Sequence, residues 1–183
     1  MKKILLSLML LVGLNVYAQD TLSTNNATIN FDATSAGSPE KIEAISKQVK
    51  SKLLVKTGDF VFAIQMQSFE FEKSLMKDHF NENYVESTKY PRATFKGAIQ
   101  DFAKVNFAKD GKYPVVVKGT MDMHGVKKEV TANGTLTISG DKVTASSSFK
   151  LLLSDFNIEV PPVVGDKLAK QATITVNATY NKK

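Results

Sequence analysis

Apolar and polar side chains alternate with a period of two along most of this chain. In the segment from Val126 to Ile138 the even-numbered residues are nearly all apolar or small, and the odd-numbered residues are polar. Successive side chains of a β-strand point to opposite faces, so this pattern predicts a strand with one face toward a core and one toward water. The pattern recurs in residues 29–33, 49–55, 60–66, 95–99, 113–123, 143–153 and 172–180. The sequence therefore predicts an all-β fold of about eight strands.

Half-apolar strands bury their apolar faces either in a sandwich of two sheets or in a closed barrel. The predicted inward face favours the barrel because it combines small residues, which leave room, with methionines, which line irregular apolar cavities. These residues are Gly97, Gly119, Ala132, Gly134, Ala145, Ser147, Met66, Met121 and Met123. We therefore expect an extended antiparallel β-barrel with space for one small ligand. In the alternative interpretation, the glycines are only bends that let a sheet curl.

Three short segments predict where strands break or turn. The apolar phase slips by one residue near Gln67-Ser68, which predicts a bulge or strand break because such a slip exchanges the two faces. Thr57-Gly58-Asp59 predicts a hairpin turn. His124-Gly125 predicts a two-residue hairpin loop, in which histidine tolerates the left-handed backbone conformation and performs no chemistry.

Two segments predict helix. Between Phe71 and Pro91 the residues Leu75, Met76, His79, Phe80 and Tyr84 share one apolar face, so we expect a short helix that covers the sheet interior, with His79 half-buried. Ser38-Pro39-Glu40 has the order of a helix N-terminus and predicts a helix from Pro39 to about Lys47. Phe156, Ile158 and Val160, by contrast, predict another short strand.

The first residues have the order of a secretory signal peptide. Lys2-Lys3 precede an apolar run, and Val16-Tyr17-Ala18 supplies small residues before the expected cleavage after Ala18. Residues 1–18 are thus predicted to be removed, and residues 19–183 to form one domain in the periplasm or outside the cell. The chain has no cysteine, so its core must stabilise it without disulfides.

Charge and motifs exclude several classes of function. Removing Lys2 and Lys3 lowers the net charge from +6 to +4, and the remaining lysines are scattered rather than concentrated in a stripe as in nucleic-acid-binding proteins. This charge is compatible with weak, transient attraction to an anionic membrane surface. We find no activated nucleophile, phosphate loop, dinucleotide fingerprint or metal-ligand spacing, so we expect no enzyme activity, no metal and no cofactor.

Three parts of the sequence resemble the YceI-like family of exported lipid-binding proteins. They are FEFEKSLMKDHFNENYVESTKYPRATFKG from Phe69, the segment from Tyr113 through Gly119 to Val130, and Ser148 to Ile158. The resemblance covers most of the chain after Val49. It implies a lipocalin-like antiparallel barrel whose cavity holds a long polyisoprenoid chain. The predicted helix from Pro39 to Lys47 departs from the family pattern and would alter the rim of the barrel.

We predict that the protein sequesters or carries a long-chain amphiphile, such as a polyisoprenoid or an isoprenoid-quinone-like lipid. The expected cavity lining is Phe62, Ile64, Met66, Phe69, Phe71, Phe95, Met121, Met123, Phe149 and Leu151, with Leu75, Met76, Phe80 and Tyr84 closing one end. Each of these residues could also be ordinary core. The rival hypothesis is a packed barrel, without a lipid ligand, whose loops bind another envelope protein. Both hypotheses leave a homodimer open.

Overall fold

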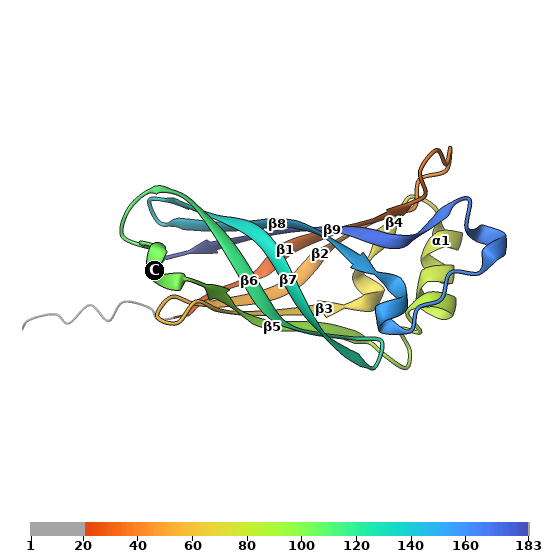
Figure 1. The fold of residues 1–183 in the computed structure, drawn as a ribbon, viewed down its shortest axis with the longest axis horizontal. Coiled ribbons are helices and arrows are strands. Elements are labelled where there is room, and N and C mark those ends of the chain that lie inside the picture. The colour runs from red at the N-terminus through yellow and green to blue at the C-terminus, as the bar shows by residue number, and fades with distance from the viewer. Residues whose placement is uncertain (1–20, 183) are drawn as a thin grey trace, which may run out of the picture.

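The chain forms one closed, elongated antiparallel β-barrel (Figure 1). The computed structural model describes residues 21–182. Eight long strands follow the order β1-β9-β8-β7-β6-β5-β3-β2, and pairing of β1 with β2 closes the barrel. The strands are β1 (Thr21–Thr34), β2 (Glu43–Leu54), β3 (Asp59–Gln65), β5 (Arg92–Gln100), β6 (Gly111–Met123), β7 (Val126–Ser139), β8 (Lys142–Leu152) and β9 (Leu168–Asn181), with the two-residue β4 (Glu70–Phe71) beside the start of β2. The predicted all-β barrel of about eight strands is confirmed.

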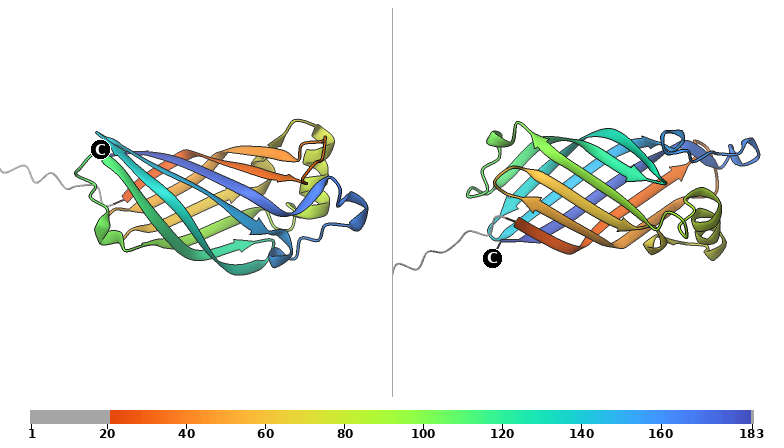
Figure 2. Two further views of the ribbon diagram at one scale, coloured as in Figure 1. Left: turned by 45° about the horizontal axis from the view of Figure 1, so that its top comes forward. Right: turned by 90° about the horizontal axis from the view of Figure 1, so that it is seen from below.

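The larger helical elements gather at one end of the barrel. There α1 (Ser74–His79) continues into a π-helical turn, η2 (Phe80–Tyr84), and the segment that follows β8 runs beside them (Figure 1). The remaining helical turns are η1 (Met66–Ser68), η3 (Phe102–Lys104), η4 (Leu153–Phe156) and η5 (Pro162–Val164). The strands are inclined to the long axis, as closure of a sheet requires (Figure 2).

The predicted turns and the predicted break are present. His124 and Gly125 connect β6 to β7 with φ values of 51° and 75°, the left-handed pair that a two-residue hairpin needs. Gly58, with φ of 77°, connects β2 to β3. The phase slip corresponds to η1, where the Ser68 hydroxyl donates to the Gln65 carbonyl oxygen at 2.6 Å. This interruption separates β3 from β4 and turns the chain toward α1.

The end of the barrel opposite α1 is filled by side chains. Leu53, Leu136, Val143 and Tyr180 are completely buried there. The Tyr180 hydroxyl lies 2.6 Å from the Ser51 hydroxyl, so the polar atom of this large side chain is satisfied inside the core. These residues fill the barrel at this end, where Phe102 of η3 and Phe107 also pack against the core.

The predicted helix from Pro39 to Lys47 is wrong. Residues 39–42 form an irregular connection, and β2 begins at Glu43 and pairs with β1, with Ala44 opposite Phe31. The Ser38 hydroxyl does accept a hydrogen bond from the Glu40 backbone N–H, at 3.2 Å, but it also donates to the Glu40 carbonyl, so it closes a local turn. Strand pairing outweighs the local helix signal, and no helix lies between β1 and β2 to alter the rim of the barrel.

The predicted strand at Phe156 to Val160 is also wrong. The chain leaves β8 through the helical turn η4, and Asn157 adopts a left-handed backbone with φ of 55°. Phe156 and Ile158 are buried, so their alternation reflects two side chains that a turn directs into the barrel. The predicted signal peptide lies outside the described residues.

Two facing glycines permit a close approach of β5 and β6. Gly97 lies opposite Gly119, and a Cβ on Gly119 would collide with the Cα of Gly97 and the carbonyl of Lys96. These two glycines therefore serve close backbone approach rather than open space in the barrel.

Candidate functional site: an apolar cavity under the helical end

A cavity of about 480 Å³ occupies the barrel at the helical end. Its walls come from β1, β3, β5, β6, β8 and β9, and α1, η2 and η4 contribute to its cover. The exposed Leu75 of α1 lies on its lining, so the cavity opens to solvent beside this helix. A cavity of this size lies within the range of about 300–1,000 Å³ typical of small-molecule sites.

A second, smaller cavity of about 100 Å³ lies further along the barrel. It is bounded by apolar residues such as Phe60 and Val117 and by the small residues of β7 and β8 that the sequence placed on the inward face. Four residues, Ile29, Ile64, Met121 and Ile174, line both cavities. The two spaces are therefore neighbours, separated by apolar side chains, of which Met121 is long and flexible enough to change rotamer.

Aromatic rings form the cover beneath α1. Phe80 is buried at the start of η2, and its ring centroid lies 5.1 Å from that of Phe71, 5.5 Å from that of Phe69 and 5.8 Å from that of Phe31. Edge-to-face and tilted pairs at these distances are favourable aromatic arrangements. This cluster ties η2 to β1 and β4, whereas α1 itself contains no buried residue.

All fourteen residues predicted to line a cavity lie on one of the two. The larger cavity is lined by Ile64, Met66, Phe69, Phe71, Leu75, Met76, Phe80, Tyr84, Met121, Met123 and Leu151, and the smaller one by Phe62, Ile64, Phe95, Met121 and Phe149. Their role as ligand contacts stays a prediction. His79, expected to be half-buried, is exposed, because the short α1 presents this part of its surface to the opening.

Sequence reasoning missed two groups of lining residues. The first consists of apolar side chains of the larger cavity that come from β1, β5, β9, η4, η5 and connecting segments, namely Ile29, Phe31, Ile42, Val85, Ala93, Leu153, Ile158, Val164, Leu168 and Ile174. The alternation of apolar and polar residues in β1 and β9 could have identified Phe31 and Ile174 as inward-facing. The second group is charged, and no sequence pattern connects its members.

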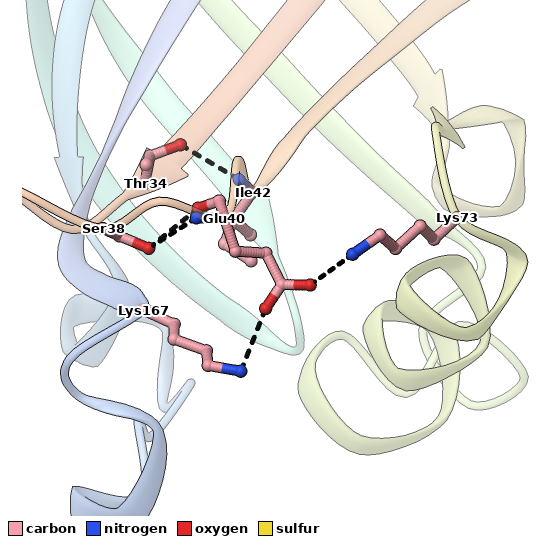
Figure 3. Close-up of polar contacts among 6 residues, drawn as sticks. All are labelled: Thr34, Ser38, Glu40, Ile42, Lys73 and Lys167. Carbon is pink, nitrogen blue, oxygen red and sulfur yellow. Dashed lines mark hydrogen bonds and ion pairs between the residues drawn. The ribbon is translucent and has the colours of Figure 1, made fainter.

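Three charged residues form the rim of the larger cavity: Glu40, Lys73 and Lys167 (Figure 3). Glu40 Oε1 lies 2.6 Å from Lys73 Nζ, and Glu40 Oε2 lies 3.1 Å from Lys167 Nζ. The hydrogen bond from Lys73 holds the pKa of Glu40 below its usual range, and the same bond raises the pKa of Lys73. One carboxylate thus bridges the β1–β2 connection, the start of α1 and the start of β9.

His124 has a structural role beyond its turn. Its Nδ1 lies 2.8 Å from the Phe156 carbonyl oxygen and its Nε2 lies 2.9 Å from Glu86 Oε2, while Tyr90 packs edge-to-face on the ring. The side chain is only 8% exposed. His124 therefore joins the β6–β7 hairpin to two segments of the helical end, and it does not line either cavity.

Within residues 21–182, no group of three or more His, Cys, Asp or Glu side chains is arranged to hold a metal ion. Over the same residues, no helix has the length and apolar character needed to span a bilayer.

The fold and cavity define a hollow antiparallel β-barrel, the architecture in which eight strands enclose space for one small ligand. The chain belongs to the YceI-like family, because the model of the YceI-like domain matches residues 20–180. The resemblance inferred from the motifs is thus confirmed. A search of curated proteins gave no match.

Solved structures share this fold at low sequence identity. A domain from Saccharophagus degradans described as polyisoprenoid-binding has a TM-score of 0.75 at 13% identity, covering 90% of this chain and 99% of its own. BcnA from Burkholderia cenocepacia has a TM-score of 0.68 at 19% identity, with 84% and 95% covered. The YCEI protein from Campylobacter jejuni has a TM-score of 0.63 at 16% identity, with 81% and 90% covered.

Proposed function

We propose that this protein binds a long-chain amphiphile, a polyisoprenoid or an isoprenoid-quinone-like lipid, with its apolar tail inside the barrel. The observation that carries the proposal is the 480 Å³ cavity, whose lining is apolar except at the rim and which adjoins a second apolar space deeper in the barrel. The description of the Saccharophagus degradans domain as polyisoprenoid-binding supports the same ligand class.

Hydrophobic burial would supply the affinity. Each buried methylene contributes about 0.8 kcal/mol, so ten tail carbons would contribute about 8 kcal/mol before the cost of ordering the tail. Because Met66, Met121 and Met123 are flexible, they can adapt to a branched tail without a rigid match of shape. The proposed role is binding without a reaction.

The cavity favours this proposal over a packed barrel that binds only through its loops. A packed barrel needs side chains that fill its interior, as they do at the end around Tyr180. At the other end the lining residues leave space under α1.

The test is organic extraction of protein purified from its native host, followed by mass spectrometry. We expect a stoichiometric lipid with an isoprenoid tail that reappears after delipidation and incubation with a total lipid extract. Repeated recovery of the protein without any lipid, together with no uptake by the delipidated form, would reject the proposal.

We further propose export to the periplasm or the cell exterior, supported by the order of basic, apolar and small residues before Ala18. Mass analysis of the exported protein should show a chain that begins at Gln19. Recovery of the folded protein with Met1 intact would contradict export by cleavage.

A further inference from the structure

We propose that residues 153–158, which contain η4, form a flap over a side window between β7 and β8, and that the lipid tail enters and leaves the barrel through this window. The inference rests on the proposed lipid binding and adds the route by which the site exchanges its ligand.

The window lies where β7 and β8 separate toward the helical end (Figure 1). The ladder between these strands ends at Gly134 opposite Ser147. Beyond that point β7 remains paired with β6 as far as Val126, and β8 remains paired with β9 as far as Leu152. Within residues 21–182, no backbone pairing joins β7 to β8 beyond the end of their ladder. The barrel wall is therefore not a continuous sheet at this place.

The flap fills the space that the two strands leave. Leu153, Phe156 and Ile158 are buried, and the first and last of these line the larger cavity, so the inner side of the flap is part of the cavity wall. The backbone N–H groups of Asn157 and Ile158 donate at 3.2 Å to carbonyl oxygens of the flap itself. After Leu153, no backbone hydrogen bond joins the flap to a strand in the part of the chain that the structure describes. Opening the flap therefore breaks side-chain contacts but no β-ladder.

Two side chains near the tip of the β6–β7 hairpin hold the flap closed. His124 Nδ1 lies 2.8 Å from the Phe156 carbonyl oxygen, and Lys128 Nζ lies 3.8 Å from Asp155 Oδ1. The lysine and aspartate side chains are 48% and 50% exposed, so this ion pair adds little to the stability of the closed form. Opening also exposes the apolar inner side of the flap, which an arriving lipid tail can cover. The flap should thus open more readily than the surrounding sheet.

The window borders both cavities. On its β7 side, Val130 and Ala132 line the smaller cavity. On its β8 side, Phe149 lines the smaller cavity and Leu151 lines the larger one. A tail that enters sideways reaches both spaces at once, whereas a tail that enters beside α1 must pass the four side chains shared by the two cavities.

The experiment locks each possible route with a reducible cross-link, which is feasible because the chain has no cysteine of its own. Lys128→Cys with Asp155→Cys, joined by a short bis-maleimide that contains a disulfide, locks the flap to β7. Glu70→Cys with Lys77→Cys replaces an ion pair of 2.8 Å and locks α1 to β4 in the same way. The rates of uptake and release of retinol, an isoprenoid alcohol that fluoresces in apolar surroundings, are measured by rapid mixing with the delipidated protein.

We expect the flap lock to slow uptake and release of retinol about tenfold or more, because a closed lid limits exchange. Reduction of the cross-link should restore both rates. The α1 lock should leave both rates within about twofold of those of the unmodified protein, and neither lock should change the affinity at equilibrium.

Single substitutions test the contacts that hold the flap. His124→Asn should speed retinol release about tenfold, because the contact with the flap carbonyl is lost. Lys128→Gln should speed it about twofold, because an exposed ion pair contributes less. Lys127→Gln is the matched control and should leave the rate unchanged, because this lysine lies 3.8 Å from Asp122 within the hairpin rather than beside the flap.

Slowing by the α1 lock alone, equal slowing by both locks, or no slowing by either would overturn the side window and leave lipid binding intact. Equal release rates in Lys128→Gln and Lys127→Gln, with no acceleration in His124→Asn, would also contradict a flap held by these contacts. Failure of the unmodified protein to bind retinol at all would reject the proposed function itself, and the route with it.

Discussion

Ionisation of Tyr180 should make the stability of the fold depend on pH in the alkaline range. Burial raises the pKa of its phenol from 10.0 to about 12, opposed by its hydrogen bond with Ser51. Below pH 10 the phenol is protonated in both the folded and the unfolded state, so its ionisation does not affect stability there. Between pH 10 and 12 the unfolded chain loses the proton first, so the free energy of unfolding should fall by roughly 3 kcal/mol as pH rises through this window.

The measurement is chemical denaturation of the unmodified protein and of Tyr180→Phe at several pH values from 8 to 12. Lysines and other tyrosines titrate in both proteins, so the difference between the two curves isolates Tyr180. Parallel curves would show that folding does not raise the pKa of the Tyr180 phenol. At neutral pH the variant should lose about 1 kcal/mol, because the buried Ser51 hydroxyl loses its partner.

The buried contacts of His124 lead to a second prediction about the free energy of unfolding. On the sequence alone, His124→Asn should preserve the fold, because asparagine accepts the left-handed backbone. The contacts of the ring with Phe156 and Glu86 change this expectation, and we now expect the variant to lose about 1–3 kcal/mol of unfolding free energy.

Ligand binding should survive His124→Asn, since the residue lines neither cavity. His79→Asn, at the exposed histidine of α1, is the stability control and should change the free energy of unfolding by less than about 0.5 kcal/mol. Equal stability losses in the two variants would argue against the anchoring role of His124.

At the scale of elements, Ala132 and Gly134 of β7 both line the smaller cavity. Substitutions at these two positions test whether a lipid tail occupies that cavity. A Cβ at Gly134 would lie 2.8 Å from the Ser146 carbonyl oxygen on β8, so Gly134→Leu strains the strand pair whatever the ligand. Gly134→Leu is therefore not a clean test of cavity filling. Ala132 already carries a Cβ and lines the same cavity.

We expect Ala132→Leu to cost less than Gly134→Leu in denaturant unfolding of delipidated protein, where overpacking a closed core costs about 1–3 kcal/mol. The amount of lipid recovered by extraction from Ala132→Leu should fall, because the new side chain occupies space deep in the barrel. Full lipid retention by Ala132→Leu would place the tail only in the larger cavity.

For the whole molecule, one end of the barrel is packed and the other is hollow. Leu53, Leu136 and Tyr180 are completely buried at the packed end, whereas α1 at the hollow end has no buried residue. Hydrogen exchange of the delipidated protein should therefore be fastest in α1 and η5 and slowest in β7 and β9 near Tyr180.

Lipid should slow exchange at the hollow end and raise the overall stability by mass action, by about 2.7 kcal/mol at a free ligand concentration of 100 times Kd. Exchange that is uniform along the barrel, or unchanged by lipid, would contradict a site under the helical end.

The sequence by itself determined that about eight long strands are present, together with the turns at Gly58 and His124-Gly125, the break at η1 and most inward-facing residues of the strands. These features are local: a period of two places side chains on alternate faces of any extended strand, whatever its partners. Eight of the fourteen residues predicted to line a cavity lie in strands, and the shared apolar face of a helix indicated Leu75, Met76, Phe80 and Tyr84.

Tertiary structure determined the conformation of those segments whose local sequence signals were ambiguous or absent. Ser38-Pro39-Glu40 has the order of a helix start, but pairing of β2 with both β1 and β4 makes the following residues a strand. Phe156 and Ile158 alternate as in a strand, although a turn carries them into the barrel. No local pattern connects Glu40 with Lys73 and Lys167, because only closure of the barrel brings their three segments to one opening. Contacts between residues far apart in the chain have no periodic signature, and the rim of this cavity consists of such contacts.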